Sequence, residues 1–328
     1  MQPFEYASPA TQEQAVSLLG RTWGATAVLA GGTDLLALMK GDIVHPKRLV
    51  NIKDIKECQG ITADAGGLRI GALTTLAEVA DNVHVVKDYP ALAVAVNEAA
   101  SPQIRNVATL GGNLCQRPHC WYFRNGFGLL PKDEAGKDLV SAGDNRYHAI
   151  LGNQGPAKFV SPSTIAPVLI AYGAKIRLAG PKGKRELLLE RFFVTPKVEG
   201  EREHDLKPNE ILTEVLLPPS ALKVGYYEVR QKAAFDWPLA VAAVALRLNG
   251  STVQSARVVA GYVAPVPWIS REAAQALAGK SVSDGTAKAA AEAALRHATP
   301  LSRNGYKVQL AKVAIKRAIL KAAAGGAA

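Results

Sequence analysis

The sequence predicts an α+β protein of roughly two or three domains, and three observations support this fold class. The chain has 328 residues, which is enough to bury cores of ordinary size in several domains. Helix-like and strand-like apolar patterns follow one another along its whole length. Pro218-Pro219 then interrupts these patterns before the last third and predicts a domain boundary.

The N-terminal region, residues 1–55, predicts a small α+β unit. A helix is expected to begin after the capping residue Thr11, and a strand follows at Thr26–Leu29. After a glycine turn, a short helix ends at Lys40 and a second strand covers Arg48–Ile52.

The middle region, residues 56–219, mixes strands and helices. Leu68–Leu73 predicts a strand, Thr74-Thr75 a helix start, and the apolar run Leu92–Ala100 a buried helix. Beyond a long loop, Phe159–Leu178 predicts a helix followed by a strand, and Ile211–Leu217 predicts a strand before the double proline.

Residues 220–328 predict a three-stranded antiparallel sheet followed by helices. The expected strands are Val224–Lys232, Leu239–Leu248 and Val253–Val263. Asn249-Gly250 between the last two is a strong hairpin signal. The expected helices lie near Arg271–Leu277, Thr286–His297 and Tyr306–Lys321.

Two glycine segments carry the first functional hypothesis. The first glycine segment is Ala30-Gly31-Gly32-Thr33-Asp34, and the second is Ala108-Thr109-Leu110-Gly111-Gly112-Asn113. Glycines let the backbone approach a ligand closely, and exposed N–H groups with nearby Thr hydroxyls suit phosphate oxygens. Either segment alone fits an ordinary tight turn. Together they indicate a cradle for a diphosphate.

Charge is concentrated at the C-terminus. The net charge is +11, and residues 221–328 hold 15 Lys and Arg against 5 Asp and Glu. The last helix is expected to be amphipathic, with Val308, Ala311, Ile315 and Ile319 on one face and with Lys307, Lys312, Lys316, Arg317 and Lys321 as its charges. These charges fit a solvated face or a docking surface for an acidic partner. Nucleic-acid binding is disfavoured because no aromatic residues alternate with them.

Three cysteines, Cys58, Cys115 and Cys120, are too few for a disulfide framework, so reduced thiols are expected. No apolar run is long enough to span a bilayer, and the first residues lack the pattern of a secretory signal. No Ser, His and Asp constellation stands out, and we predict no catalytic residue in this chain.

These residues resemble a known family over nearly the whole chain. The two glycine segments, Gly71–Thr75, Ser101–Asn106 and the basic C-terminal part look like the FAD-binding subunit of the xanthine dehydrogenase and carbon monoxide dehydrogenase family. Within it, Cys120–Arg124 and Asp144–Ala149 resemble the branch of bacterial aldehyde oxidoreductases built from three separate subunits.

The resemblance implies a fold and a division of labour. It implies a two-subdomain FAD-binding fold of the PCMH type, residues 1–55 and 56–219, followed by a basic α+β domain of the CO dehydrogenase flavoprotein type, residues 220–328. A large partner would hold a molybdenum cofactor and a small partner 2Fe-2S clusters. This chain would bind FAD and pass electrons to an external acceptor.

The resemblance also implies site residues. The FAD pyrophosphate would be wrapped by Val28, Leu29, Ala30, Gly31, Gly32, Thr33, Asp34 and Leu35, and a second wall would come from Thr109, Gly112 and Asn113. Ala99 and Leu212 would lie against the cofactor, although Leu212 equally fits a strand core. Arg230 would place a cation close to the flavin, unless it is an exposed strand arginine.

Two departures from the family pattern matter. Where relatives have Ser-Asp, this chain reads Pro162-Ser163-Thr164, so Thr164 would contact the cofactor without a carboxylate, or would belong to a plain helix cap. Relatives often carry a 4Fe-4S cluster in a loop that here, at Gly126–Leu139, has no cysteine. His119 and His148 could join a zinc site, but Cys-x4-Cys is not a usual zinc spacing. We therefore expect no metal.

Two alternative functions stay open at this stage. The chain could be a self-contained flavin oxidase or reductase, which would need its own acid or base, or a non-catalytic scaffold that has lost its flavin. Because the first residues lack a signal pattern, we expect the protein in the cytoplasm, or in the periplasm by co-export with a partner that bears a signal.

Overall fold

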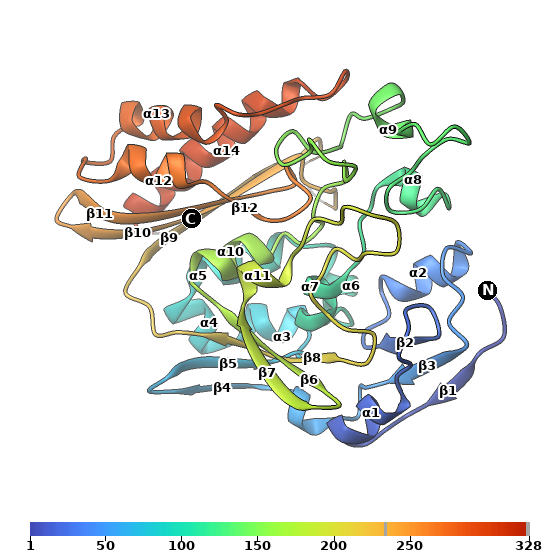
Figure 1. Ribbon diagram of the computed structural model, residues 1–328. Coiled ribbons are helices and arrows are strands. Elements are labelled where there is room, and N and C mark those ends of the chain that lie inside the picture. Colours follow the sequence, from blue (N-terminus) through green and yellow to red (C-terminus); the bar gives the residue numbers. More distant parts are fainter. Residues whose placement is uncertain (233–234, 326–328) are drawn as a thin grey trace.

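The computed structural model describes residues 1–232 and 235–325, and within them the strands form three sheets (Figure 1). The predicted α+β fold is confirmed. The N-terminal unit, in blue, lies at one edge of the molecule, and the last sheet with its helices, in orange and red, lies at the opposite end.

The N-terminal unit is a parallel sheet in the order β1-β3-β2. Its elements are β1 (Glu5–Ala7), α1 (Gln12–Leu18), β2 (Thr26–Leu29), α2 (Leu35–Lys40) and β3 (Arg48–Asn51). Thr11 caps α1 as predicted, because its hydroxyl accepts a hydrogen bond from the Gln14 amide at 3.2 Å. β1 was not predicted, since none of its three residues is buried and no alternation marks it.

The middle unit is a five-stranded sheet in the order β4-β5-β8-β6-β7. Its strands are β4 (Ile61–Asp64), β5 (Gly67–Gly71), β6 (Lys175–Gly180), β7 (Gly183–Leu188) and β8 (Ile211–Leu217). β8 has the predicted bounds and lies between β5 and β6, so segments distant in sequence meet here. The edge strands β4 and β7 were not predicted, because both are largely exposed and polar.

Short helices accompany this sheet. They are η1 (Lys56–Cys58), α3 (Leu76–Asp81), α4 (Val83–Asp88), α5 (Pro90–Glu98), α6 (Pro102–Arg105), α7 (Leu110–Cys115), α8 (Trp121–Arg124), α9 (Leu139–Ala142), α10 (Ala166–Ala171) and α11 (Leu189–Phe192). The predicted helix start at Thr75 is confirmed by a capping box with Glu78. Figure 1 shows α5 and α10 between the five-stranded sheet and the last sheet.

The C-terminal unit contains the three predicted antiparallel strands and one more. β9 (Lys223–Val229), β10 (Ala240–Asn249) and β11 (Thr252–Gly261) are joined by β12 (Trp268–Ile269), whose two residues are too few to show a period. The hairpin at Asn249-Gly250 is confirmed, with Gly250 at φ +57°. The helices are α12 (Arg271–Leu277), α13 (Asp284–Ala294) and α14 (Tyr306–Ala323).

β10 is buried on both faces, which explains its continuous apolar sequence. Val241, Ala243 and Ala245 join a core cluster with α5, α10 and β8. Ala242, Val244 and Leu246 join a second cluster with α12, α13 and α14. The four-stranded sheet therefore holds the middle unit to the C-terminal helices.

One expectation about α14 is wrong. Ile315 and Ile319 are buried as expected, but Lys307 is buried too, with 1% of its surface exposed. Its ammonium donates hydrogen bonds to the carbonyl oxygens of Tyr147, His148 and Tyr262 at 3.1, 3.1 and 2.7 Å. Burial nevertheless lowers the pKa of Lys307 to about 7, so the three carbonyls offset only part of the desolvation of its charge. A residue expected among the helix's outward charges therefore lies inside.

Among the described residues, no helix is both long and apolar enough to cross a membrane.

The close packing of β9 against α14 gives a first prediction. A Cβ added at Gly225 would overlap the Ala318 carbonyl oxygen and the backbone of Ala322. We expect Gly225→Ala to lower the free energy of unfolding by about 1–3 kcal/mol in urea titrations. Gly305→Ala is the matched control, because nothing lies within 4 Å of its added Cβ. Equal stability of the two variants would contradict this packing.

Candidate functional site

The two glycine segments lie against each other, as their likeness suggested. A Cβ at Gly31 would overlap the Val107 carbonyl oxygen and lie 3.2 Å from the Ala108 Cα. Gly32 adopts φ +76°, a left-handed conformation that favours glycine. The first glycine segment thus forms a turn, as predicted, and its backbone contacts the start of the second glycine segment.

The second glycine segment is the start of a helix rather than a turn, which corrects the sequence interpretation. Thr109 caps α7, and its hydroxyl accepts a hydrogen bond from the Gly112 amide at 3.0 Å. Gly111 is buried, and a Cβ there would lie 2.8 Å from the Ala72 Cβ. Gly111 therefore serves packing, and the Gly112 amide is already occupied by the cap.

A cavity of about 250 Å³ opens beside both segments, and we call it the glycine cleft. Six of the predicted site residues line it: Thr33, Asp34, Ala99, Gly112, Asn113 and Thr164. Its other walls include Leu76, Glu98, Ala100, Gln116, His119, Pro162 and Trp237.

The other predicted residues do not line the glycine cleft in the described part of the chain. Val28 and Leu29 belong to β2, the turn after it holds Ala30, Gly31 and Gly32, and Leu35 begins α2. Thr109 is buried as the helix cap. Leu212 is a buried residue of β8, opposite Leu178, which is the strand-core alternative.

Arg230 is held by carboxylates instead of facing the cleft. Its guanidinium donates to the Glu98 carbonyl oxygen at 2.7 Å and pairs with the carboxylates of Glu98 and Glu228. It lines a separate groove with Tyr226, while Glu98 borders both this groove and the glycine cleft. Burial raises the pKa of Glu228, although Tyr226 and Arg230 oppose that shift.

Ser163 and Thr164 divide the two roles that the sequence left open. The Ser163 hydroxyl donates to the Asn113 side-chain oxygen at 2.6 Å and accepts from the Ala166 amide at 3.0 Å. It therefore supports the start of α10 and orients Asn113. Thr164 lines the glycine cleft.

Asp34 joins the first glycine segment to a segment that the sequence did not connect with it. One carboxylate oxygen accepts from the Arg124 guanidinium at 2.6 Å, and the other accepts from the Arg117 amide at 2.9 Å. Arg117 in turn lies over the Phe123 ring at 4.7 Å and pairs with the buried Glu203. No spacing in the sequence signals these long-range pairs.

The backbone at Ala100 is strained at the edge of the cleft. Ala100 has φ +52°, which L residues rarely adopt, and Arg105 donates to the carbonyl oxygens of Ala99 and Ala100 at 2.9 and 3.3 Å. These bonds hold the turn after α5 in place, and Ala99 faces the cleft as a result.

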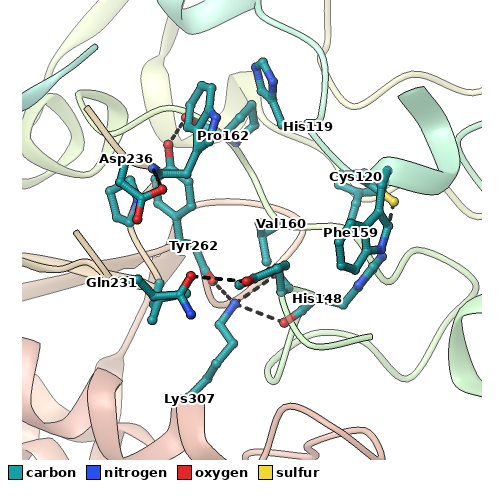
Figure 2. A pocket seen from close by; sticks show the side chains of 15 residues that line it. His119, Cys120, His148, Phe159, Val160, Pro162, Gln231, Asp236, Tyr262 and Lys307 are labelled. Carbon is teal, nitrogen blue, oxygen red and sulfur yellow. Dashed lines mark hydrogen bonds between the residues drawn. The ribbon is translucent and has the colours of Figure 1, made fainter. Parts of the chain in front are cut away.

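A second cavity of about 330 Å³ shares a wall with the glycine cleft (Figure 2). His119, Pro162, Asp236, Trp237 and Pro238 border both. The His119 and Trp237 rings lie 4.1 Å apart between their centroids. This second cavity was not predicted from the sequence.

The thiols and imidazoles near these cavities are neutral. Burial raises the pKa of the Cys115 thiol to about 12 and raises that of Cys120 as well. Burial and the Lys307 charge lower the pKa of His148 to about 4, and burial and Arg124 lower that of His119. Within the described residues, no three His, Cys, Asp or Glu side chains are grouped so that they could hold a metal ion.

The family of this chain follows from the fold and the sequence together. Residues 2–220 match the family of FAD binding domains in molybdopterin dehydrogenase, and residues 225–322 match the CO dehydrogenase flavoprotein C-terminal domain. The chain belongs to the family of FAD-binding medium subunits of the xanthine dehydrogenase and carbon monoxide dehydrogenase enzymes.

Individual relatives of this family align with this chain over nearly their full lengths. The aldehyde oxidoreductase FAD-binding subunit PaoB of Escherichia coli is 34% identical, with 99% of each chain covered. The carbon monoxide dehydrogenase medium chain of Hydrogenophaga pseudoflava is 29% identical, with 96% of each covered. A solved carbon monoxide dehydrogenase from the latter organism superposes with a TM-score of 0.78 at 29% identity, covering 99% of both chains. Quinoline 2-oxidoreductase of Pseudomonas putida superposes with 0.77 at 26% identity, covering 99% of this chain and 98% of that one.

The Asp34 contacts give a second prediction. Asp34→Ala removes two hydrogen bonds, one of them charge-assisted, and we expect a loss of about 1–3 kcal/mol in the free energy of unfolding. Amide hydrogen exchange over residues 117–124 is expected to accelerate. Asp54→Ala, at an exposed residue shortly after β3, is the control. Unaltered exchange over that segment in Asp34→Ala would refute the tether.

Proposed function

We propose that this chain is the FAD-binding electron-transfer subunit of a heteromeric molybdenum hydroxylase, an aldehyde oxidoreductase. The observation that carries the proposal is the meeting of the two glycine segments at one cleft, in a chain of this family. Electrons from 2Fe-2S clusters of a small partner would pass through FAD to an external acceptor. A large partner with the molybdenum cofactor would oxidise and select the substrate.

The residues of the glycine cleft fit FAD. Thr33 and Thr164 offer hydroxyl groups and Asn113 offers an amide group. These neutral groups can donate hydrogen bonds to the oxygens of a diphosphate and a sugar. The Asp34 carboxylate is paired with Arg124, so it does not oppose an anionic ligand. A Cβ at Gly112 would lie 2.9 Å from the Thr109 hydroxyl, which would have to shift slightly, and would meet nothing else within 4 Å, so the rest of this edge of α7 is open.

When bound, FAD supplies a group that takes up and releases electrons. The task of this chain is then to bind, orient and shield that group. Asn113 is held in orientation by Ser163, and the contact of Gly31 with Val107 holds the first glycine segment beside the second. Arg230 would act on the cofactor only through Glu98, because the two carboxylates compensate its charge.

The alternative functions are less well supported. A self-contained oxidase or reductase needs an acid or base that titrates near neutral pH, whereas the pKa of His148 is about 4 and that of His119 is lowered. Burial lowers the pKa of Lys307 to about 7, but its ammonium hydrogens are used by three backbone carbonyl oxygens. A scaffold without flavin would not need an open cleft beside the glycine segments in which hydroxyl and amide groups interrupt an apolar lining. The likeness to PaoB favours an aldehyde as substrate of the assembled enzyme.

We propose the domain limits 1–55, 56–219 and 220–328. In support, each of the three sheets lies wholly within one of these ranges. The cores are less separate than the sheets, since one cluster contains residues of both β8 and β10.

The cleft gives a third prediction. Gly112→Val places a branched side chain at the open edge of α7, and we expect the purified variant to lose at least about nine-tenths of its FAD while it stays folded by circular dichroism. FAD content is measured by flavin absorbance after gel filtration. Gly155→Val is the control, because an added Cβ there meets nothing within 4 Å. A folded Gly112→Val chain with full FAD would overturn the assignment.

The basic helix α14 gives a fourth prediction, on docking of an acidic partner. Lys316 is already paired with Asp284 at 2.6 Å, so the variant reverses Lys312 and Lys321 to Glu. We expect association with the partner subunits to slow about tenfold and to weaken with salt, because the Debye length falls to about 3 Å at 1 M. FAD content should not change.

Lys280→Glu with Lys288→Glu is the control for the change in net charge, since both lysines lie in the same domain and outside α14; they are exposed, whereas Lys312 and Lys321 are half-buried. Association rates measured by stopped flow over a salt series distinguish a docking surface on α14 from a solvated helix face. Rates that do not depend on salt, and that the α14 reversal does not alter, would leave these lysines as a solvated face.

A further inference from the structure

The second cavity has walls that the proposed FAD site does not use. We call it the aromatic cavity and define it by Trp121, Tyr147, Phe159, Trp237, Tyr262 and His148, which line its volume of about 330 Å³. Figure 2 shows His148, Gln231, Tyr262 and Lys307 around its interior. Aromatic walls of this kind favour a flat ring, which they contact by stacking or edge-to-face packing.

Polar groups within the cavity offer hydrogen-bond donors. His148 is 97% buried, and its Nε2 lies 3.2 Å from the Cys120 sulfur. A protonated thiol can donate to that nitrogen, which leaves the proton of the neutral ring on Nδ1. Burial lowers the pKa of this ring and the nearby Asn145 backbone carbonyl raises it slightly, but no group among the described residues meets hydrogen-bond geometry at Nδ1. A buried donor without an acceptor costs free energy, and a ligand oxygen would satisfy it.

A second donor lies across the cavity. The Gln231 side-chain oxygen accepts from the Tyr147 hydroxyl at 3.1 Å, so its NH₂ group is the end left for a ligand. Lys307 also lies at the wall, but its three hydrogens go to backbone carbonyl oxygens and burial lowers its pKa to about 7. The cavity therefore offers neutral donors, which suit uncharged carbonyl oxygens on a ring.

The backbone of the wall is strained in the same place. Tyr262 has φ +60°, a conformation that bulky residues rarely adopt. It is held there because its hydroxyl donates to the Pro162 carbonyl oxygen while its own carbonyl accepts from Lys307. Tyr262 and Pro162, joined by this hydrogen bond, both line the aromatic cavity, and Pro162 also lines the glycine cleft.

We infer that the aromatic cavity binds a planar ring with carbonyl oxygens at its edge, a quinone, and that this is the site of the external electron acceptor. The inference rests on the proposed function. The aromatic cavity adjoins the glycine cleft, because five residues, His119, Pro162 and Trp237 among them, line both. Reduction of a quinone to a quinol consumes two electrons and two protons, which a fully reduced flavin releases, so no other reactant is required.

The test measures binding directly, on the FAD-loaded chain labelled with 5-fluorotryptophan. The chain has four tryptophans, of which Trp121 and Trp237 line the cavity. Trp23 lies under Arg202 and Trp268 belongs to β12, so both serve as internal controls. Titration with 1,4-naphthoquinone is expected to shift the fluorine resonances of Trp121 and Trp237 and leave the other two unchanged. Naphthalene, which lacks the carbonyls, should bind at least about tenfold more weakly.

Two variants locate the site. Val160→Phe fills the cavity and is expected to raise the dissociation constant of naphthoquinone at least tenfold, whereas Val83→Phe, on the exposed face of α4, leaves it unchanged. Gln231→Leu removes a donor at an exposed residue and is expected to weaken binding about three- to tenfold.

The outcomes separate this inference from the proposed function. If FAD binds but naphthoquinone shifts no resonance, or shifts all four alike, the acceptor site is refuted and the proposed function stands. If FAD itself shifts Trp121 and blocks naphthoquinone, the cavity belongs to the cofactor site and the inference is also wrong. If the chain takes up no FAD, the proposed function fails, and the acceptor role fails with it even if naphthoquinone binds.

Discussion

The first glycine segment can lie against the second because Gly31 has no side chain. Its Cα approaches the Val107 carbonyl so closely that any Cβ would overlap it, and this contact joins the N-terminal unit to the middle one beside the cleft. Asp34, three residues later, continues the same junction through Arg124 and the Arg117 amide. The walls of the proposed FAD site are thus held in place by the Gly31–Val107 backbone contact and by the Asp34 carboxylate. Neither interaction requires a bound ligand.

The four-stranded sheet extends this arrangement to the C-terminal helices. Alternate residues of β10 belong to two different cores, so the sheet is a shared layer rather than the surface of a separate domain. Lys307 of α14 also connects these parts, since its ammonium donates hydrogen bonds to the carbonyl oxygens of residues 147, 148 and 262. The two cavities lie where these layers meet, and their common wall contains Pro162 and Trp237.

Much of the fold could be predicted from the sequence, but only part of the site. β2, β8 and α12 have the predicted bounds because apolar periodicity and caps are local signals. β12 and the edge strands were missed because they are too short or too exposed to show a period. Burial of Lys307 and the Asp34–Arg124 pair depend on contacts between residues far apart in sequence, which no spacing reveals. The Cys120–Arg124 and Asp144–Ala149 motifs were noticed, but not the cavity that they help to build.

The burial of Lys307 also sets an order for assembly during synthesis. The carbonyls of Tyr147 and His148 leave the ribosome well before the lysine that gathers them, and β10 is made before the helices that cover one of its faces. A nascent chain that ends before α14 therefore leaves both the aromatic cavity and an apolar sheet face incomplete. Only when this last helix docks are the wall of the aromatic cavity and the second core completed, and both are completed together.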